Sequence, residues 1–140
     1  SPWYRLGLLL LLCELPGCGG TPPMKIAPAE VIVKINGQPA ADILVQFLPN
    51  VDPTVPAISA SGTTDASGKV ILTASNGTLG ALVGPNKVVL ADLTEERPPQ
   101  GKPATRKPRL PSRYMVLGPE TPEVVVKEDG NTPFEILVQN

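Results

Sequence analysis

Proline and glycine divide this chain into short pieces. Of its 140 residues, 18 are proline and 13 are glycine, and both types are spread along the sequence. Proline removes a backbone donor and clashes with the preceding helical turn, so a long helix does not fit between the breaks. Aromatic residues make up only 4% of the chain. These features argue against a helical bundle and favour an all-β fold of short strands and turns.

The segments between the breaks are rich in β-branched residues and several of them alternate apolar with polar residues. Two turn signals stand out, because Asn36-Gly37 and Asp129-Gly130 are dipeptides typical of tight hairpins. We expect the first to join strands 30–35 and 41–48 and the second to join the last two strands. Ile43, Val45 and Phe47 share one face. The seven predicted strands are 30–35, 41–48, 59–64, 69–73, 87–91, 123–127 and 134–138, which together suit a β-sandwich.

The N-terminal segment has the order of an export signal. Arg5 is followed by an apolar run over 6–13, which is far shorter than the roughly 20 residues of a membrane span and suits a signal-peptide core. The small-residue segment Leu15, Pro16 and Gly17 then precedes Cys18. This arrangement resembles the signal peptide and lipobox of bacterial lipoproteins. The resemblance implies cleavage before Cys18, a diacylglyceryl group on its thiol and acylation, for example by palmitate, of the new N-terminus.

This hypothesis divides the chain into three parts. Residues 1–17 are a lipoprotein signal peptide, 18–29 are a proline-rich tether and 30–140 are the folded domain. The mature protein would be exported and anchored to a bacterial membrane through Cys18 on the periplasmic side. Gly19, where an aspartate would favour retention, makes the outer membrane the expected destination. One acyl chain anchors only weakly, so the two or more chains of a lipoprotein matter for stable attachment.

The composition also limits the chemistry. The net charge is −1 and the chain has no histidine. The charge gives no electrostatic footprint for nucleic acid, and the lack of histidine removes the commonest general base and transition-metal ligand. Cys13 would leave with the signal peptide, so the mature chain could form no internal disulfide. We therefore expect no enzyme activity, no cofactor and no metal site.

Residues 94–113 contain five prolines and a group of basic side chains, and no regular element is expected there. Spaced and exposed by proline, these cations are candidate contacts for anionic lipid head groups or an acidic wall polymer. The alternative is a solvated crossover loop kept soluble by its charge. The candidate residues are Arg97, Lys102, Arg106, Lys107, Arg109 and Arg113.

Other polar and aromatic residues favour structural roles. Asp65, at the start of 65–68, is expected to close a turn, since the spaced ligands and final glutamate of a calcium loop are missing. Asp42, at the start of a strand, is expected to be a solvated hairpin residue, and Asn76-Gly77-Thr78 is expected to form a turn. Tyr114 and Phe134 are expected in or beside the core.

Three motifs resemble carboxypeptidase-regulatory-like, transthyretin-like domains: the strand-turn-strand opening over 31–47, the hairpin Gly62 to Val70, and the segment Gly80 to Leu90. Together with Leu110 to Tyr114 and the lipobox, they resemble small lipoproteins of planctomycete-type bacteria. The sequence departs from the pattern at Asn86, where an aromatic residue is usual, and at Val83. The resemblance implies a seven-stranded transthyretin-like or Ig-like β-sandwich without catalytic activity.

Two functions remain open at this point. The chain could be an interaction module of the cell envelope that binds protein or polysaccharide through loops 50–58, 75–85 and 94–113. It could instead carry a small ligand between its sheets or in a dimer channel, as transthyretin does. Its oligomeric state is not determined by these patterns.

Overall fold

The computed structural model describes residues 24–95, 100–102 and 108–140, and within them the fold is all-β. These residues form three sheets and one 3-10 turn, η2 (Ser112–Tyr114). The eleven strands are β1 (Ile26–Ala27), β2 (Glu30–Ile35), β3 (Gln38–Pro39), β4 (Ile43–Pro49), β5 (Ala60–Thr63), β6 (Lys69–Ile71), β7 (Thr73–Ala74), β8 (Ala81–Leu82), β9 (Gly84–Asp92), β10 (Glu123–Val126) and β11 (Phe134–Val138).

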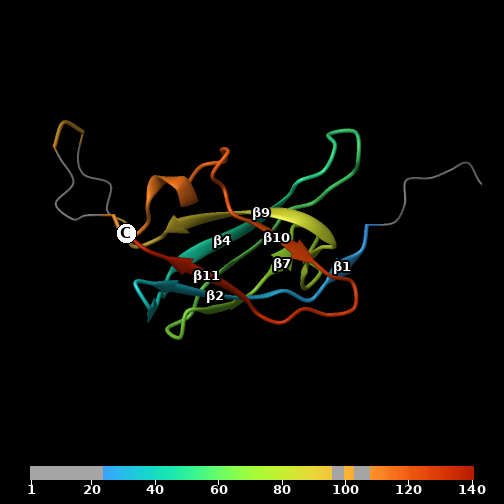
Figure 1. Ribbon diagram of the computed structural model, residues 1–140, viewed down its shortest axis with the longest axis horizontal. Coiled ribbons are helices and arrows are strands. Elements are labelled where there is room, and N and C mark those ends of the chain that lie inside the picture. Colours follow the sequence, from blue (N-terminus) through green and yellow to red (C-terminus); the bar gives the residue numbers. More distant parts are fainter. Residues whose placement is uncertain (1–23, 96–99, 103–107) are drawn as a thin grey trace, which may run out of the picture.

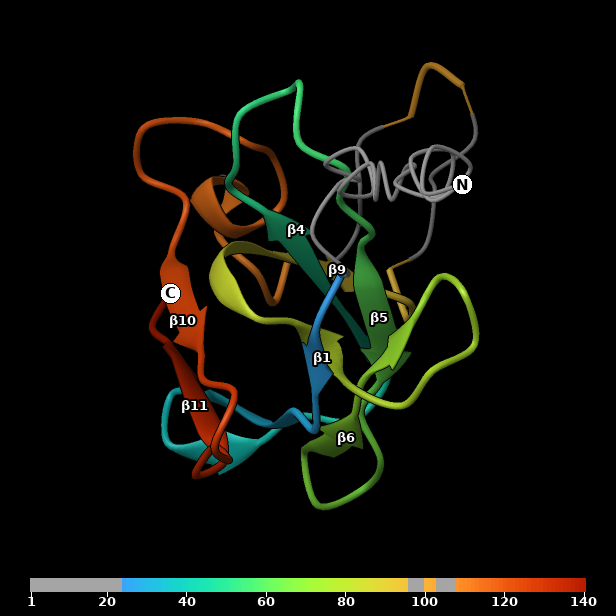
Figure 2. The ribbon, with the colours of Figure 1, turned by 90° about the vertical axis from the view of Figure 1, so that its right-hand side faces the viewer.

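Two larger sheets provide most of the fold. One has the order β10-β9-β4-β5-β7 and the other has β11-β2-β3, with β6 also paired to β2. Figure 1 shows β2 and β11 side by side on one side of the molecule, below β4 and β9, and Figure 2 shows the same arrangement from one end. A third sheet consists only of β1 and β8. All pairings are antiparallel except that of β11 with β2, which is parallel.

The core lies where the two larger sheets face each other. Ile43, Val45 and Phe47 on β4 are fully buried, and this confirms the predicted inward face of that strand. Val31 and Val33 of β2 are buried on the opposing sheet. Edge-to-face contact between Phe47 and Phe134, with ring centroids 5.6 Å apart, joins the sheets directly. Burying one face of each strand in this way supplies the main driving force for the fold.

The prediction of the first hairpin is correct for the turn at Asn36-Gly37 but wrong for the strand that pairs with 30–35. Asn36 and Gly37 have φ values of 50° and 82°, as a tight turn with two left-handed residues requires. However, β2 pairs with the two-residue β3, and the predicted return strand 41–48 crosses to the other sheet as β4. Because β2 and β4 both bury one face, placing them in opposite sheets closes the core from both sides.

Residues 40–42, hereafter the corner, carry the chain from one sheet to the other. Asp42 adopts a φ of 60° there. The Thr64 hydroxyl is buried and donates to the Ala40 carbonyl oxygen at 2.6 Å, while it accepts from the Ile43 amide at 3.0 Å. The Asp42 amide also donates to the Thr64 carbonyl oxygen. Thr64 therefore satisfies backbone groups that would otherwise be left unpaired in the interior.

The second predicted hairpin is wrong. Residues 128–131 do not join paired strands, because β10 pairs with β9 in one sheet and β11 pairs with β2 in the other. The Asn131 side chain accepts from the Lys127 amide and donates to the carbonyl oxygens of Lys127 and Pro28. These bonds stabilise a crossover between the sheets. Each strand can then bury its own apolar face, with Val126 on one side and Ile136 on the other.

The predicted strand 69–73 is divided between the sheets at Leu72. The alternation of buried and exposed side chains continues through the break, but β6 pairs with β2 and β7 pairs with β5. Leu72 itself is fully buried, and its backbone bonds to Ala29 and Gly80. This division, and the addition of β1, β3 and β8, raises the seven expected strands to eleven within the described residues.

The end of the predicted tether belongs to the fold. Residues 26–27 form β1, which pairs with β8 inside the segment 75–85 that was expected to be a loop. Ala27 and Ala29 are buried in the main core. Gly80, just before β8, lies so close to the Ala27 carbonyl that no Cβ would fit there, and this lets β1 approach β8. Residues 18–23 lie outside the described part of the chain.

We predict that Thr64→Val destabilises the protein by about 1–3 kcal/mol, because valine keeps the shape but leaves the buried Ala40 oxygen and Ile43 amide unpaired. Thr63→Val is the matched control, since Thr63 is the exposed neighbour on β5. Urea unfolding followed by circular dichroism measures both. Equal stability of the two variants would contradict the role assigned to Thr64.

Candidate functional site

Most of the residues singled out in the sequence lie outside the described part of the chain. These are Cys18 with its lipobox residues Leu15, Pro16 and Gly17, and the basic residues Arg97, Arg106 and Lys107. The structure places the other three basic candidates, Lys102, Arg109 and Arg113. Lys102 is exposed, whereas Arg109 and Arg113 have specific contacts on the folded body.

Arg109 forms an ion pair within the fold, and its contact with an anionic surface stays a prediction. Its guanidinium binds both carboxylate oxygens of Asp92, through Nε to Oδ2 at 2.8 Å and through Nη2 to Oδ1 at 2.7 Å. Nη2 also donates to the Ala41 carbonyl oxygen in the corner. A two-point contact of this kind is stronger and more directional than a single ion pair. Residues 108–110 are thereby fastened to the end of β9.

The same contact determines the charge state of Asp92. Hydrogen bonds from the Arg109 guanidinium, and then from the hydroxyl and amide of Thr94, lower the pKa of Asp92 to about 2 despite the opposing effect of burial. The Asp92 side chain is only 6% exposed. In turn, the carboxylate raises the pKa of Arg109. The pair is therefore fully charged over the whole neutral and mildly acidic range.

Leu110 and Tyr114 close the side of the sandwich next to Arg109. Both are buried in the main core, on either side of Pro111 and the start of η2. The Tyr114 hydroxyl donates to the Leu137 carbonyl oxygen on β11, at 3.4 Å. Tyr114 was expected in or beside the core, and this is confirmed. Phe134 is partly buried against the same cluster.

Arg113 lies on the outer side of Leu110 and Tyr114. Its guanidinium carbon is 4.9 Å from the centre of the Tyr114 ring, and Nη2 donates to the Gln139 carbonyl oxygen at 3.4 Å. Stacking on an aromatic face orients a guanidinium while leaving its edge free to bind a partner. Arg113 is therefore the one described basic candidate that is both exposed and held in position.

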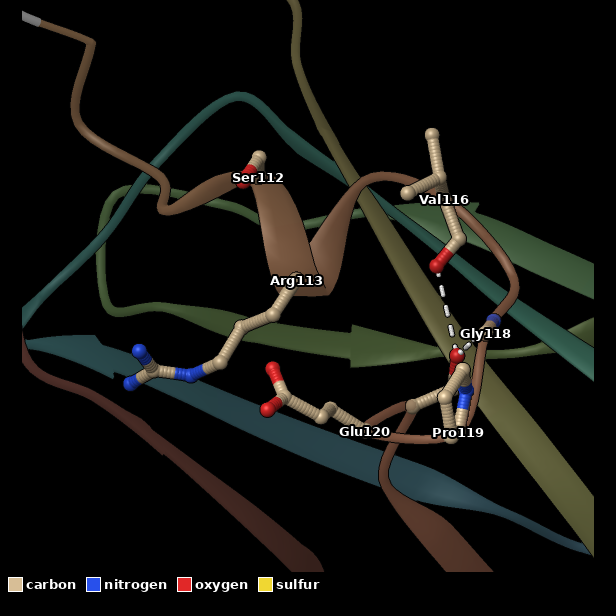
Figure 3. A pocket seen from close by; sticks show the side chains of 7 residues that line it. Ser112, Arg113, Val116, Gly118, Pro119 and Glu120 are labelled. Atoms are coloured by element: carbon tan, nitrogen blue, oxygen red, sulfur yellow. Dashed lines mark hydrogen bonds between the residues drawn. The ribbon is translucent and has the colours of Figure 1, made fainter.

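A pocket of about 300 Å³ opens beside Arg113, between η2 and the following loop. Figure 3 shows Arg113 and Glu120 projecting on the same side of this recess. The loop is closed by Thr121, whose hydroxyl accepts from the Gly118 amide at 2.7 Å and donates to the Val116 carbonyl oxygen at 3.2 Å. The lining residues are Ser112, Arg113, Val116, Gly118, Pro119, Glu120 and Thr121.

The chemistry of the pocket is suited to binding. It combines a cation, a carboxylate and a hydroxyl with the apolar surface of Val116 and Pro119. Val116 is 63% and the adjacent Leu117 58% exposed. Mixed charge beside exposed apolar side chains is typical of the contact surfaces that proteins use for other macromolecules. Of these lining residues only Arg113 could be predicted from the sequence, because the recess depends on how residues 115–121 fold back in three dimensions.

The described parts of two of the expected binding loops lie apart. In Figure 1 the loop 50–58 lies toward the β1 end of the long axis, whereas residues 100–102 and 108–111 lie at the opposite end, near the C-terminus. The turn η2 also lies on the half of the molecule away from β1.

Several polar residues have the structural roles that were predicted. Asp65 accepts from the amides of Ser67 and Lys69 and from the Ser67 hydroxyl, which confirms a turn. The turn at Asn76 is likewise confirmed by the bond from the Thr78 amide to its Oδ1. Within the described ranges, no cluster of three acidic, cysteine or histidine residues could hold a metal ion. Nor does this part of the chain contain a helix long and apolar enough to span a membrane.

Asn86 stands where the transthyretin-like domains that the sequence resembles usually have an aromatic residue, and it lies in the core. It is 1% exposed, and its Nδ2 donates to the carbonyl oxygens of Leu82 and Gly84. Its Oδ1 has no hydrogen-bond partner among the described residues. The two donated bonds stabilise the bend between β8 and β9, where an aromatic side chain could make neither.

Comparison with protein-family models, curated proteins and solved structures found no match to this chain.

We predict that Arg109→Met destabilises the protein by about 1–3 kcal/mol at neutral pH, because it leaves the Asp92 carboxylate without its main partner. The folded pKa of Asp92 lies below the unfolded value of 3.8, so the stabilisation is complete above this pH. It is lost as the pH falls through the folded pKa of about 2, and only below this value is Asp92 mainly protonated in both states.

Urea unfolding of the wild type and Arg109→Met between pH 7 and pH 2 measures this effect. The difference in unfolding free energy should narrow toward the acid end, while the exposed Arg113→Met serves as the control with little change. A difference that stays constant with pH would contradict the assignment.

Proposed function

We propose that this chain is an exported, lipid-anchored, non-catalytic binding module of the bacterial cell envelope, with a transthyretin-like β-sandwich as its framework. Acyl chains on Cys18 would hold it on the periplasmic side, and the outer membrane is the favoured location. The partner would be an envelope protein or polysaccharide. The pocket beside Arg113 is the proposed contact surface.

The observation that carries this proposal is the rigid attachment of an exposed pocket. The segment 109–114 is held at both ends. Arg109 binds Asp92 and the corner, and Tyr114 is buried in the core. Binding surfaces gain affinity when their side chains are already ordered, since less freedom is lost on association. Arg113 meets this condition through its position on the Tyr114 ring.

The placement of the pocket also suits an anchored protein. The described chain begins next to β1, at the end of the long axis opposite the C-terminus (Figure 1). Residues 18–23 can span at most about 20 Å even when fully extended. The β1 end would therefore lie near the membrane, and Lys102 and Arg113 would point toward the envelope space. This geometry favours an envelope partner over the head groups of the anchoring membrane.

The carrier alternative has less support. A carrier needs an apolar cavity of ligand size within the fold or between subunits. The space between the two sheets is instead occupied by a continuous set of buried side chains, with Phe47 packed against Phe134. The lack of histidine supports the non-catalytic part of the proposal.

We predict that Cys18 is lipidated. The full chain, expressed in a bacterium with a start methionine, should have an intact mass in detergent extracts that fits cleavage before Cys18 plus acyl groups. Cys18→Ser should abolish both changes, because no thiol remains to receive the diacylglyceryl group. Cys13→Ser is the matched control and should be processed normally. An uncleaved, unmodified wild-type chain would contradict the anchor.

We also predict that the pocket contacts the partner. A photoreactive side chain at Val116 in the anchored protein should give a defined crosslinked product in cells, detected by immunoblotting and mass spectrometry. Ile71 is the matched control, since both residues are 63% exposed and Ile71 lies on β6. Arg113→Ala should weaken the Val116 product. Identical products from Val116 and Ile71, or none from Val116, would refute this surface.

A further inference from the structure

The chain contains two Asn-Gly pairs in similar exposed turns, Asn36-Gly37 and Asn76-Gly77. Both glycines have positive φ values, 82° and 90°, and neither has any atom near the position of a Cβ. The two pairs therefore match in sequence and exposure. They differ in the backbone of the asparagine, since Asn36 has a φ of 50° and Asn76 does not have a positive φ, and in their hydrogen bonds.

This dipeptide has a characteristic reactivity. The amide nitrogen of the glycine, unhindered by a side chain, can lose its proton and attack the asparagine Cγ. The bond from Cγ to Nδ2 breaks, ammonia leaves with that proton, and a five-membered succinimide forms. Water then opens either carbonyl of the ring to give aspartate or isoaspartate. No oxidant, reductant or enzyme is required.

The Asn36 carboxamide is held at both of its polar atoms. Its Nδ2 donates to the Asn140 Oδ1 at 2.9 Å, and its Oδ1 accepts from the Asn140 amide at 3.2 Å. Asn140 is itself fixed, since its Nδ2 donates to the Arg109 carbonyl oxygen at 2.6 Å. For Cγ of Asn36 to turn toward the Gly37 nitrogen, both bonds to Asn140 must break.

The hydrogen bonds at Asn76 lie within its own turn. The Asn76 Oδ1 accepts from the Thr78 amide at 3.0 Å, and the attacking Gly77 nitrogen donates to the Ala74 carbonyl oxygen at 2.9 Å, a bond that must break before reaction. The leaving group, Nδ2 of Asn76, donates no hydrogen bond to any described residue. Figure 2 shows the yellow-green loop that contains it protruding from the right side of the molecule, clear of the sheets.

We propose that Asn76 is a site of spontaneous deamidation in the folded protein, and that Asn140 protects Asn36 from the same reaction. The product carries one more negative charge at residue 76. Aspartate would keep the bond to Thr78, whereas isoaspartate adds a carbon to the backbone of the turn. That turn is closed by bonds from the Ala74 amide to Thr78 and from the Gly77 amide to Ala74, and isoaspartate would disrupt them.

The test incubates the full purified chain at mildly alkaline pH and measures aspartate and isoaspartate at both positions by peptide mapping. Conversion at Asn76 should be about tenfold or more faster than at Asn36. Reaction at Asn76 opens only bonds within the exposed turn 74–78, whereas reaction at Asn36 must break both side-chain bonds to the distant Asn140. In denaturant the two rates should become similar. Equal rates in the folded protein, or no conversion at Asn76, would overturn the proposal.

Three variants distinguish protection of Asn36 by Asn140 from the effect of the local Asn-Gly sequence. Asn140→Ala should accelerate conversion at Asn36 toward the rate at Asn76, whereas the neighbouring Gln139→Ala should leave it slow. Gly77→Ala should suppress conversion at Asn76, because the new Cβ hinders the attacking nitrogen. Far-UV circular dichroism checks that each variant is folded. No acceleration in a folded Asn140→Ala would show that Asn140 does not protect Asn36.

Discussion

The corner at residues 40–42 is the constraint on which the rest of the structure depends. Its three consecutive carbonyl oxygens accept from three separate segments: Ala40 from the Thr64 hydroxyl, Ala41 from the Arg109 guanidinium and Asp42 from the Leu93 amide. A chain that crosses between sheets leaves the ladder of both and must satisfy these groups elsewhere. Here the partners come from the end of β5, the end of β9 and the proline-rich segment, so one short crossing positions three distant parts of the chain.

The same corner connects the core to the proposed binding surface. Arg109 reaches Ala41 and Asp92, Leu110 and Tyr114 fill the open side of the sandwich, and Arg113 stacks on Tyr114 at the edge of the pocket. Residues 108–113, the described end of the proline-rich basic segment, are held by a few charge-assisted and apolar contacts. Loops that carry binding residues are useful when a rigid scaffold positions them in this way.

At the end of the molecule away from β1, polar side chains connect the C-terminal residues to the Asn36 turn and to residues 109–113. Asn140 links the Asn36 turn to residue 109, and the Gln139 carbonyl oxygen receives Arg113. The parallel pairing of β11 with β2 brings Asn36 and Asn140 together, although they are 104 positions apart in the sequence. The stability of that end and the chemical durability of Asn36 thus depend on the same few hydrogen bonds.

The sequence alone determined the local features. Its prolines and glycines excluded long helices, the alternation in 43–47 identified the inward face of β4, and Asn36-Gly37 and Asp65 specified their turns, because these properties depend on neighbouring residues. Only the tertiary structure decided which strands pair, that Arg109 binds Asp92 and that residues 112–121 form a pocket. Strand pairing, ion pairs and recesses depend on residues far apart in the chain, and several partners with similar apolar patterns could satisfy each strand until all were packed together.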